Sequence, residues 1–274
     1  MKALNYFAAA ALMVAAFSFT SCNKEDETTP LAEVLQQDDE VGDYFDEILA
    51  EADDASLSYT GSALKSSIET QVEGTGTRTV ATTFSGDTVI HTITFVNFAN
   101  ARRPDRIKNG IIVVKMVGRY AQEVFWRQVR LTSLTINDLP VQGTKIIEKT
   151  GTYQFTITLT GGRVDFADGT FYTRNASRVR TWNAGYNTPA VIIDDEYSIT
   201  GTATGVNRNG NEYVHEITSP LIVKMNCRWI VQGIIEFVVN NQTAVLDYGD
   251  GTCDRIATLT VNGNVYTINL RGRL

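Results

Sequence analysis

Three carboxylates lie close enough in the sequence to suggest a site for a hard cation. Asp247, Asp250 and Asp254 fall within eight residues, around two glycines. Calcium takes several oxygen ligands at about 2.3 to 2.6 Å, often from a tight loop, but this spacing lacks the 1, 3, 5 pattern of an EF-hand. The similar stretch 165–170 lacks a third acid. We therefore favour a structural turn over a calcium site, with Gly169 and Gly251 at positive φ and the acids accepting backbone N–H bonds.

Residue types and spacings typical of catalysis are otherwise weak. A glycosidase needs two carboxylates about 5 to 10 Å apart, and the acids available for this lie beside glycines or in turns: Asp165, Asp168, Asp194, Asp195, Glu196, Asp247 and Asp250. Two histidines, His91 and His215, are too few for a histidine-rich zinc site. We expect neither an enzyme activity nor a cofactor.

One pair of motifs matches a serine enzyme by spacing alone. Ser62 and Lys65 form an S-x-x-K, and 149–151 is a K-T-G, two of the three signatures of penicillin-interacting enzymes. No Ser-Asp-Asn stands between them, and Ser62 lies in a polar stretch rather than at the start of a buried helix. We reject this match.

Aromatic residues offer a second kind of site. Trp126, Trp182, Trp229 and Tyr186 could stack on sugar rings, although such side chains more often fill cores or interfaces. Trp182 has polar neighbours on both sides and precedes Gly185. We expect it to be the most exposed of the four and the best candidate for glycan stacking.

The elements that would position these residues are mostly strands. Apolar residues alternate with period two from about Val80 onward, in runs at 89–95, 111–117, 124–136, 144–149, 153–159, 197–204, 211–217, 229–239, 256–261 and 265–270. Asn-Gly pairs at 109–110, 209–210 and 262–263 favour tight hairpins. The pattern predicts an antiparallel all-β fold, arranged as a sandwich, a barrel or a long curved meander.

A degenerate internal repeat supports this fold. Val-Gln-Gly recurs at 141–143 and 231–233, and the loop 165–170 resembles 247–252. No linker rich in Pro, Gly or Ser separates the copies. We expect one all-β domain over 79–274, built from two related halves at about 79–151 and 152–274.

The residues before this domain are strongly acidic. Residues 24–54 contain 13 acids and one lysine, whereas 55–274 contain 18 acids and 22 bases. Within them Val41, Tyr44, Phe45, Ile48, Leu49 and Ala52 form one helical stripe. We expect 22–55 to be an acidic tether with a short helix that docks on the domain and has a solvated acidic face, and 56–78 to be a polar linker. No basic block suggests binding to nucleic acid.

The N-terminus predicts export. Lys2 precedes an apolar run from Ala3 to Phe19, followed by Thr-Ser-Cys, which is typical of a signal peptide over 1–21. The junction resembles the lipobox of bacterial lipoproteins, with Phe19 where an aliphatic residue is usual. That resemblance implies cleavage before Cys22 and acylation of Cys22 with palmitate-type chains.

The residues after Cys22 extend this resemblance. Lys24, Glu25 and Asp26 resemble the export tag of surface-exposed lipoproteins of the Bacteroidota. The second half, with Trp182, 194–197, 201–202 and 247–254, resembles an uncharacterised class of these lipoproteins, which implies location and β structure but no activity. Asp87-Thr88-Val89 resembles the acceptor for O-glycosylation in exported Bacteroidota proteins, which implies a glycan on Thr88. Cys227 and Cys253 are expected to pair in an oxidising compartment, with two buried free thiols as the alternative.

These observations predict a non-enzymatic lipoprotein on the outer-membrane surface, held in the membrane by its lipid, with a binding or structural role. One alternative is a glycan-binding module of a polysaccharide-uptake system. Another is a fimbrillin-like adhesion or assembly subunit that polymerises by strand donation. The expected partners are the membrane and either a glycan or an envelope protein.

Overall fold

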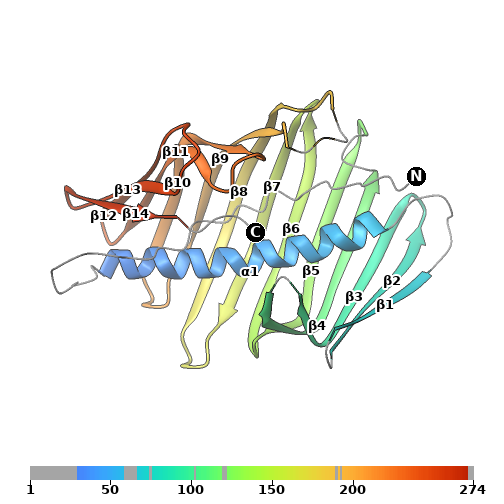
Figure 1. The fold of residues 1–274 in the computed structure, drawn as a ribbon. Coiled ribbons are helices and arrows are strands. Elements are labelled where there is room, and N and C mark those ends of the chain that lie inside the picture. The colour runs from blue at the N-terminus through green and yellow to red at the C-terminus, as the bar shows by residue number, and fades with distance from the viewer. Residues whose placement is uncertain are drawn as a thin grey trace.

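A computed structural model describes residues 30–58, 67–73, 76–101, 103–118, 122–188, 191 and 193–270. These residues form one helix and one sheet of 14 antiparallel strands (Figure 1). The elements are α1 (Pro30–Ser58), β1 (Ser67–Glu73), β2 (Gly76–Ser85), β3 (Thr88–Asn100), β4 (Arg103–Gly118), β5 (Phe125–Ile136), β6 (Leu139–Gly151), β7 (Gln154–Asp165), β8 (Phe171–Ala184), β9 (Glu196–Val206), β10 (Glu212–Lys224), β11 (Ile230–Val239), β12 (Gln242–Asp250), β13 (Ile256–Val261) and β14 (Asn264–Asn269).

The strands lie in the sheet in the order in which they occur in the chain, so each pairs with its sequence neighbours. The all-β prediction is confirmed, and of the three expected arrangements the chain adopts the curved meander. The sheet continues through the expected boundary between the halves, because β6 pairs with β7. Both halves therefore belong to one body.

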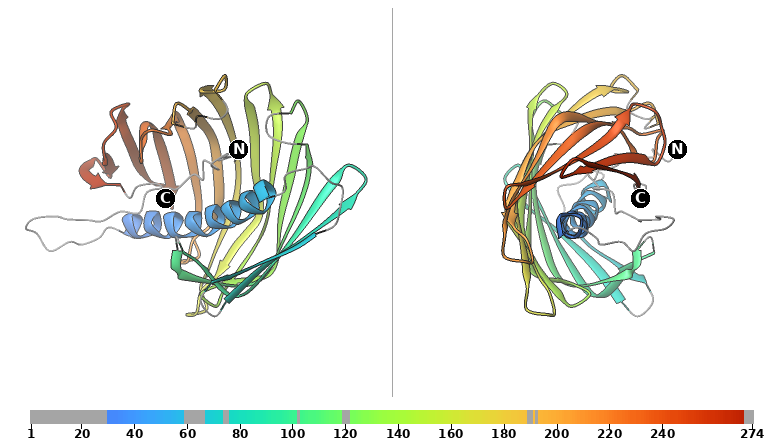
Figure 2. Two further views of the ribbon diagram at one scale, coloured as in Figure 1. Left: turned by 45° about the vertical axis from the view of Figure 1, so that its right-hand side comes forward. Right: turned by 90° about the vertical axis from the view of Figure 1, so that its left-hand side faces the viewer.

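The sheet curls around α1, which lies on its concave side (Figure 2). Register shifts interrupt most of the ladders, and such bulges bend a strand and increase its twist. The repeated Val-Gln-Gly motif explains two of them, because the pairing shifts between Gln142 and Thr144 and between Gln232 and Ile234. The glycines at these bulges, Gly143 and Gly233, have positive φ. Each copy of the Val-Gln-Gly motif therefore places a bulge in the sheet, and these bulges contribute to its curvature.

The Asn-Gly pairs have two different roles. Residues 209–210 lie in the turn between β9 and β10, and 262–263 form the two-residue turn between β13 and β14, as predicted. The prediction of a hairpin at Asn109-Gly110 is wrong, because both residues lie inside β4. There Gly110 (φ 111°) sits at a bulge, where a Cβ would lie 2.2 Å from the carbonyl oxygen of Ser133. A glycine with positive φ can serve a bulge as well as a turn.

The helix is longer and more buried than the sequence suggests. It runs without a break through Gly42 and spans 29 residues. The predicted apolar stripe from Val41 to Ala52 is buried, as expected. The expectation of a solvated acidic face is wrong, because Asp38, Asp46, Glu51 and Asp53 are also buried. The curved sheet surrounds more of the helix than a flat sheet would.

The described parts of the expected linker at 56–78 belong to regular elements. They include the end of α1, the whole of β1 and the start of β2. Strands β1, β2, β8 and β12 were absent from the runs expected from apolar alternation. In β1 and β8 polar residues occupy many positions, so an apolar period of two is weak there.

Candidate functional site between the helix and the sheet

The helix lies across the strands (Figure 1). Its acidic side chains pair with basic side chains on every second strand from β8 to β4. Asp38 binds β8, Asp46 binds β6 and Glu51 binds β4. Glu51 follows Asp38 by 13 positions, which is a rise of about 20 Å along a helix, and the four strand spacings from β8 to β4 span about 19 Å. This match of two regular spacings allows several ion pairs to form at once.

The N-terminal contact is a buried cluster around Asp38. Its Oδ1 accepts hydrogen bonds from the guanidinium of Arg174 and from the hydroxyl of Tyr172, the latter at 2.7 Å. His215 Nδ1 lies 3.1 Å from Asp38 Oδ2. Burial alone would raise the pKa of Asp38, but Arg174 and the hydrogen bond from His215 hold it well below its usual range. Burial lowers the pKa of His215 to about 4, so the neutral imidazole donates its Nδ1–H to the carboxylate.

The C-terminal half of α1 makes a second set of buried ion pairs. Lys108 Nζ lies 2.7 Å from a Glu47 oxygen and 2.8 Å from Glu51 Oε1. Glu51 Oε2 accepts a hydrogen bond from Arg78 at 2.9 Å, and Asp53 pairs with Arg127. Buried ions without partners are costly, so these contacts fix the position of the helix.

A cavity of about 50 Å³ lies between α1 and strands β6 to β9. Four cationic side chains line it, Lys145, Arg174, Arg178 and Arg180, and Asp46 is the only carboxylate among the described residues that do so. The remaining lining residues are apolar or small: Gly42, Phe45, Leu49, Ile157, Leu159, Ala176 and Ile199. The cavity is therefore strongly basic with an apolar wall.

Burial and neighbouring charges shift the pKa values of several groups that line this cavity. Burial raises the pKa of Asp46 to about 6, although Lys145 Nζ lies 3.5 Å from its Oδ1. Burial lowers the pKa of Lys145. Burial and the charge of Arg174 lower the pKa of Arg178 to about 10, so it remains a cation at neutral pH. The ligand best suited to this site is an anion.

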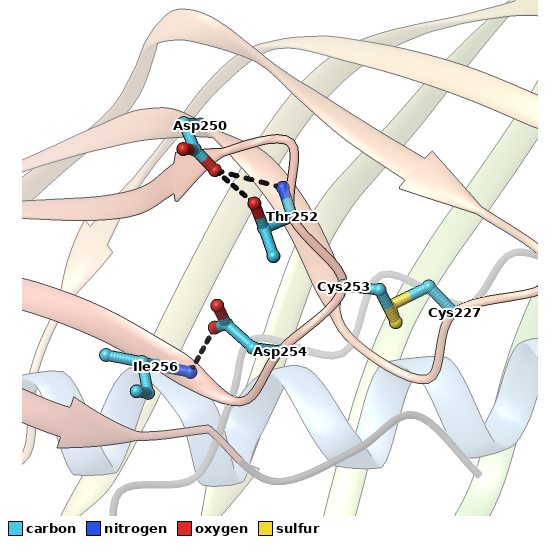
Figure 3. Close-up of a disulfide and its surroundings, with 6 residues drawn as sticks. All are labelled: Cys227, Asp250, Thr252, Cys253, Asp254 and Ile256. Carbon is cyan, nitrogen blue, oxygen red and sulfur yellow. Dashed lines mark hydrogen bonds between the residues drawn. A yellow bond between two sulfur atoms is a disulfide. The ribbon is translucent and has the colours of Figure 1, made fainter.

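The candidate calcium ligands all accept hydrogen bonds from nearby residues of the chain: Asp250 and Asp254 do so beside the turn that follows β12 (Figure 3), and Asp247 does so within β12. Asp247, Asp250 and Asp254 accept backbone N–H bonds of 2.8 to 3.0 Å from the residues two positions ahead. Asp168 bonds Thr170 as Asp250 bonds Thr252, through both the backbone and the hydroxyl. The matching loops thus share one turn geometry, and Gly169 and Gly251 have the predicted positive φ.

Cys227 and Cys253 form a disulfide beside this turn (Figure 3). It connects the segment before β11 with the segment after β12. Cys227 is buried, at 2% exposure, and Cys253 is exposed. The predicted pairing is confirmed over the alternative of two free thiols.

Other predicted site residues are dispersed. Trp182 is half-buried and stacks on Tyr197, with ring centroids 5.8 Å apart, so it is less open than expected; glycan stacking there stays a prediction. Thr88 is half-buried at the start of β3, and its glycosylation is likewise untested. His91 and His215 are far apart in the sheet order and buried. Cys22, Lys24, Glu25, Asp26, Ser62 and Lys65 lie outside the described residues.

The basic residues of β8 were missed in the sequence. Arg174, Ala176, Arg178 and Arg180 occupy alternate positions and line the same cavity. Alternating arginines are a period-two signal, but apolar residues were used to find strands. Reading charged residues with the same period would have identified both the strand and its inward face.

Three comparisons give no relative for the chain: no family model, no curated protein and no solved structure matches it. Among the residues described, no three His, Cys, Asp or Glu side chains are placed to hold a metal ion. No helix in the described part of the chain is long and apolar enough to cross a membrane.

Proposed function

We propose that the chain is a lipid-anchored protein of the outer-membrane surface with a non-enzymatic binding or structural role. The single observation that supports it best is the disulfide between Cys227 and Cys253. Disulfides persist in oxidising compartments and are rare in the cytosol. This agrees with the predicted signal peptide and with the predicted lipidation of Cys22.

The position of α1 defines how such an anchor would act. The helix begins at Pro30, eight residues after Cys22. At about 3.5 Å per residue, a fully extended chain of this length reaches about 28 Å. Because α1 is held in the sheet by buried ion pairs, the proposed lipid would attach the whole β body close to the membrane instead of through a long tether. A short attachment to a rigid body suits a structural or binding role.

Fractionation and mass spectrometry test this proposal. We expect the mature N-terminal peptide to begin at acylated Cys22, and the Cys22→Ala variant to leave the membrane fraction. Substituting Lys24, Glu25 and Asp26 by alanine should keep the protein membrane-bound but protect it from protease added to intact cells. An unmodified Cys22 in the mature protein would refute the anchor, and unchanged protease sensitivity would refute the role of the tag.

A second candidate function, an assembly subunit, is favoured by the open edges of the sheet. No described strand pairs with the outer edge of β1 or of β14. Near these edges Ile68, Val72 and Val265 are 75%, 65% and 65% exposed. Exposed edges with apolar side chains can pair with other chains. Light scattering tests this: an assembly subunit should form oligomers that Val72→Lys or Val265→Lys disrupts, whereas a monomer unaffected by concentration argues against it.

A further inference from the structure

We propose that the cavity between α1 and strands β6 to β9 binds inorganic phosphate, with Arg178 and Lys145 as cationic ligands and Asp46 as a hydrogen-bond acceptor. This inference concerns the ligand of an internal site. It holds whether or not the chain is lipid-anchored at Cys22. Three independent properties of the cavity support it: its charge, its size and its unused hydrogen-bonding groups.

The described residues that line the site include four cations and one carboxylate, Asp46. Arg174 is bound to Asp38, and Lys145 faces Asp46. Arg180 lies over the rings of Phe155 and Tyr197, at 5.4 and 5.3 Å.

Arg178 is the exception among these cations. It is half-buried and makes neither a hydrogen bond nor an ion pair with a described residue. A guanidinium that is partly withdrawn from water is stabilised by a nearby anion. Its planar fork matches the oxygens of an oxyanion in a bidentate manner.

The size of the cavity selects a small ion. A cavity of about 50 Å³ has room for a few water-sized groups, whereas sites for organic ligands typically measure about 300 to 1,000 Å³. A tetrahedral oxyanion has one central atom and four oxygens, and an ion of this size suits the small volume of the cavity.

Gly42 contributes to this room. It lines the cavity from the helix side, and a Cβ placed there would meet no atom within 4 Å. Glycine in a helix interior is less stable than alanine by about 0.5 to 1 kcal/mol. The helix therefore has an unfilled position directly at the basic cavity.

The acceptor at Asp46 favours phosphate over sulfate. Asp46 Oδ2 is buried and has no hydrogen-bond partner among the residues described. Hydrogenphosphate carries a proton that can be donated to this oxygen. Sulfate is fully ionised at neutral pH and would place two acceptors against each other. With its pKa at about 6, Asp46 is ionised at pH 7.5 and is ready to accept.

Calorimetric titration of the purified chain tests the site. At pH 7.5 in a phosphate-free buffer we expect potassium phosphate to bind and potassium sulfate to bind roughly tenfold more weakly or not at all. Arg178→Gln should reduce phosphate affinity roughly tenfold or more, which is the effect of losing a charged hydrogen bond. Arg130→Gln, at an exposed position of β5, is the matched control and should bind phosphate as the wild type does.

Two more variants make the test specific. Asp46→Asn supplies an amide donor and removes a negative charge, so sulfate should bind more tightly relative to phosphate. Gly42→Leu should block phosphate without changing any charge, and melting curves establish that each variant is folded. The proposal is overturned if the wild type takes up no phosphate, which means that the cavity holds water only. It is equally overturned if Arg178→Gln leaves phosphate affinity unchanged, or if Asp46→Asn leaves the preference for phosphate over sulfate unaltered.

Discussion

Asp38 and Arg174 stand 136 positions apart in the chain and form an ion pair whose side chains are 2% and 4% exposed. This pair joins the first element of the described chain to the eighth strand. Its partners Tyr172 and His215 come from β8 and β10. A single carboxylate thus connects three elements, which makes it the most informative position for testing how α1 is held.

Removing the Asp38 carboxylate should strongly lower the free energy of unfolding. Asp38→Ala leaves Arg174 buried without its anion, and breaking such a pair costs about 3 to 5 kcal/mol. Urea unfolding measures the difference. Asp54→Ala is the control, since Asp54 pairs with Arg78 at 2.9 Å but its side chain is 63% exposed, where pairs contribute about 1 kcal/mol or less. Similar losses in the two variants would contradict a buried, interlocking helix.

The stability of the protein should carry a pH-dependent contribution from Asp46. Its pKa is raised from 3.8 to about 6, so the folded state holds the proton more tightly than the unfolded state does. The stabilisation is complete below about pH 3.8 and is lost as the pH rises through 6. At about 1.36 kcal/mol per pKa unit, the change amounts to roughly 3 kcal/mol.

Comparing the pH dependence of stability in the wild type and in Asp46→Asn isolates the contribution of Asp46. Relative to the variant, the wild type should lose unfolding free energy between pH 4 and 6 and remain level above about pH 7. The titrations of His91 and His215 occur in both proteins and cancel in the comparison. Parallel stability curves for the two proteins would mean that the raised pKa of Asp46 is wrong.

Gly42→Ala should stabilise the protein. Gly42 lies inside α1, and an added Cβ meets no atom within 4 Å, so the variant gains about 0.5 to 1 kcal/mol from helix propensity. Gly201→Ala is the contrasting control, because Gly201 has φ 130° and its Cβ would lie 2.1 Å from the carbonyl oxygen of Ser177. We expect opposite changes in melting temperature, measured in a phosphate-free buffer.

The disulfide should stabilise the C-terminal strands. Cys227 and Cys253 are separated by 26 positions, and closing a loop of this length stabilises a protein by about 3 to 4 kcal/mol on the chain-entropy argument. A reductant should therefore lower the melting temperature of the Cys22→Ala protein, which lacks the third cysteine. Adding Cys227→Ala and Cys253→Ala to this protein should make it insensitive to reductant. If reductant leaves the melting curve of the Cys22→Ala protein unchanged, this stabilisation is contradicted.

Calcium should have no effect on the loop at Asp250. Its carboxylate already accepts two hydrogen bonds from Thr252, so Asp250→Ala should slightly lower the melting temperature by the same amount with calcium or with chelator. Asp168→Ala, in the matching loop, should behave alike. A calcium-dependent shift that only Asp250→Ala removes would reinstate a cation site.

The elements that could be predicted are those with a periodic pattern among residues close together in the chain. The apolar stripe of α1 and the alternation in most strands gave the all-β class and the docking of the helix. The candidate site depends on pairings between distant residues, such as Asp46 with Lys145. A carboxylate on the polar side of a helix looks solvated until the curvature of the sheet is known. That curvature arises from bulges, as at Gly143 and Gly233, which local alternation does not reveal.

The order of the strands has a consequence for how the chain acquires its structure. Each strand can add to the one made before it, since neighbours in the sheet are neighbours in sequence, and such local pairing favours rapid folding. The helix is synthesised before all of these strands, yet its contacts extend as far as His215 on β10. An isolated helix is marginal in water. Closure of the core around α1 therefore comes late in folding, because it requires β10, which is synthesised about 150 residues after the helix.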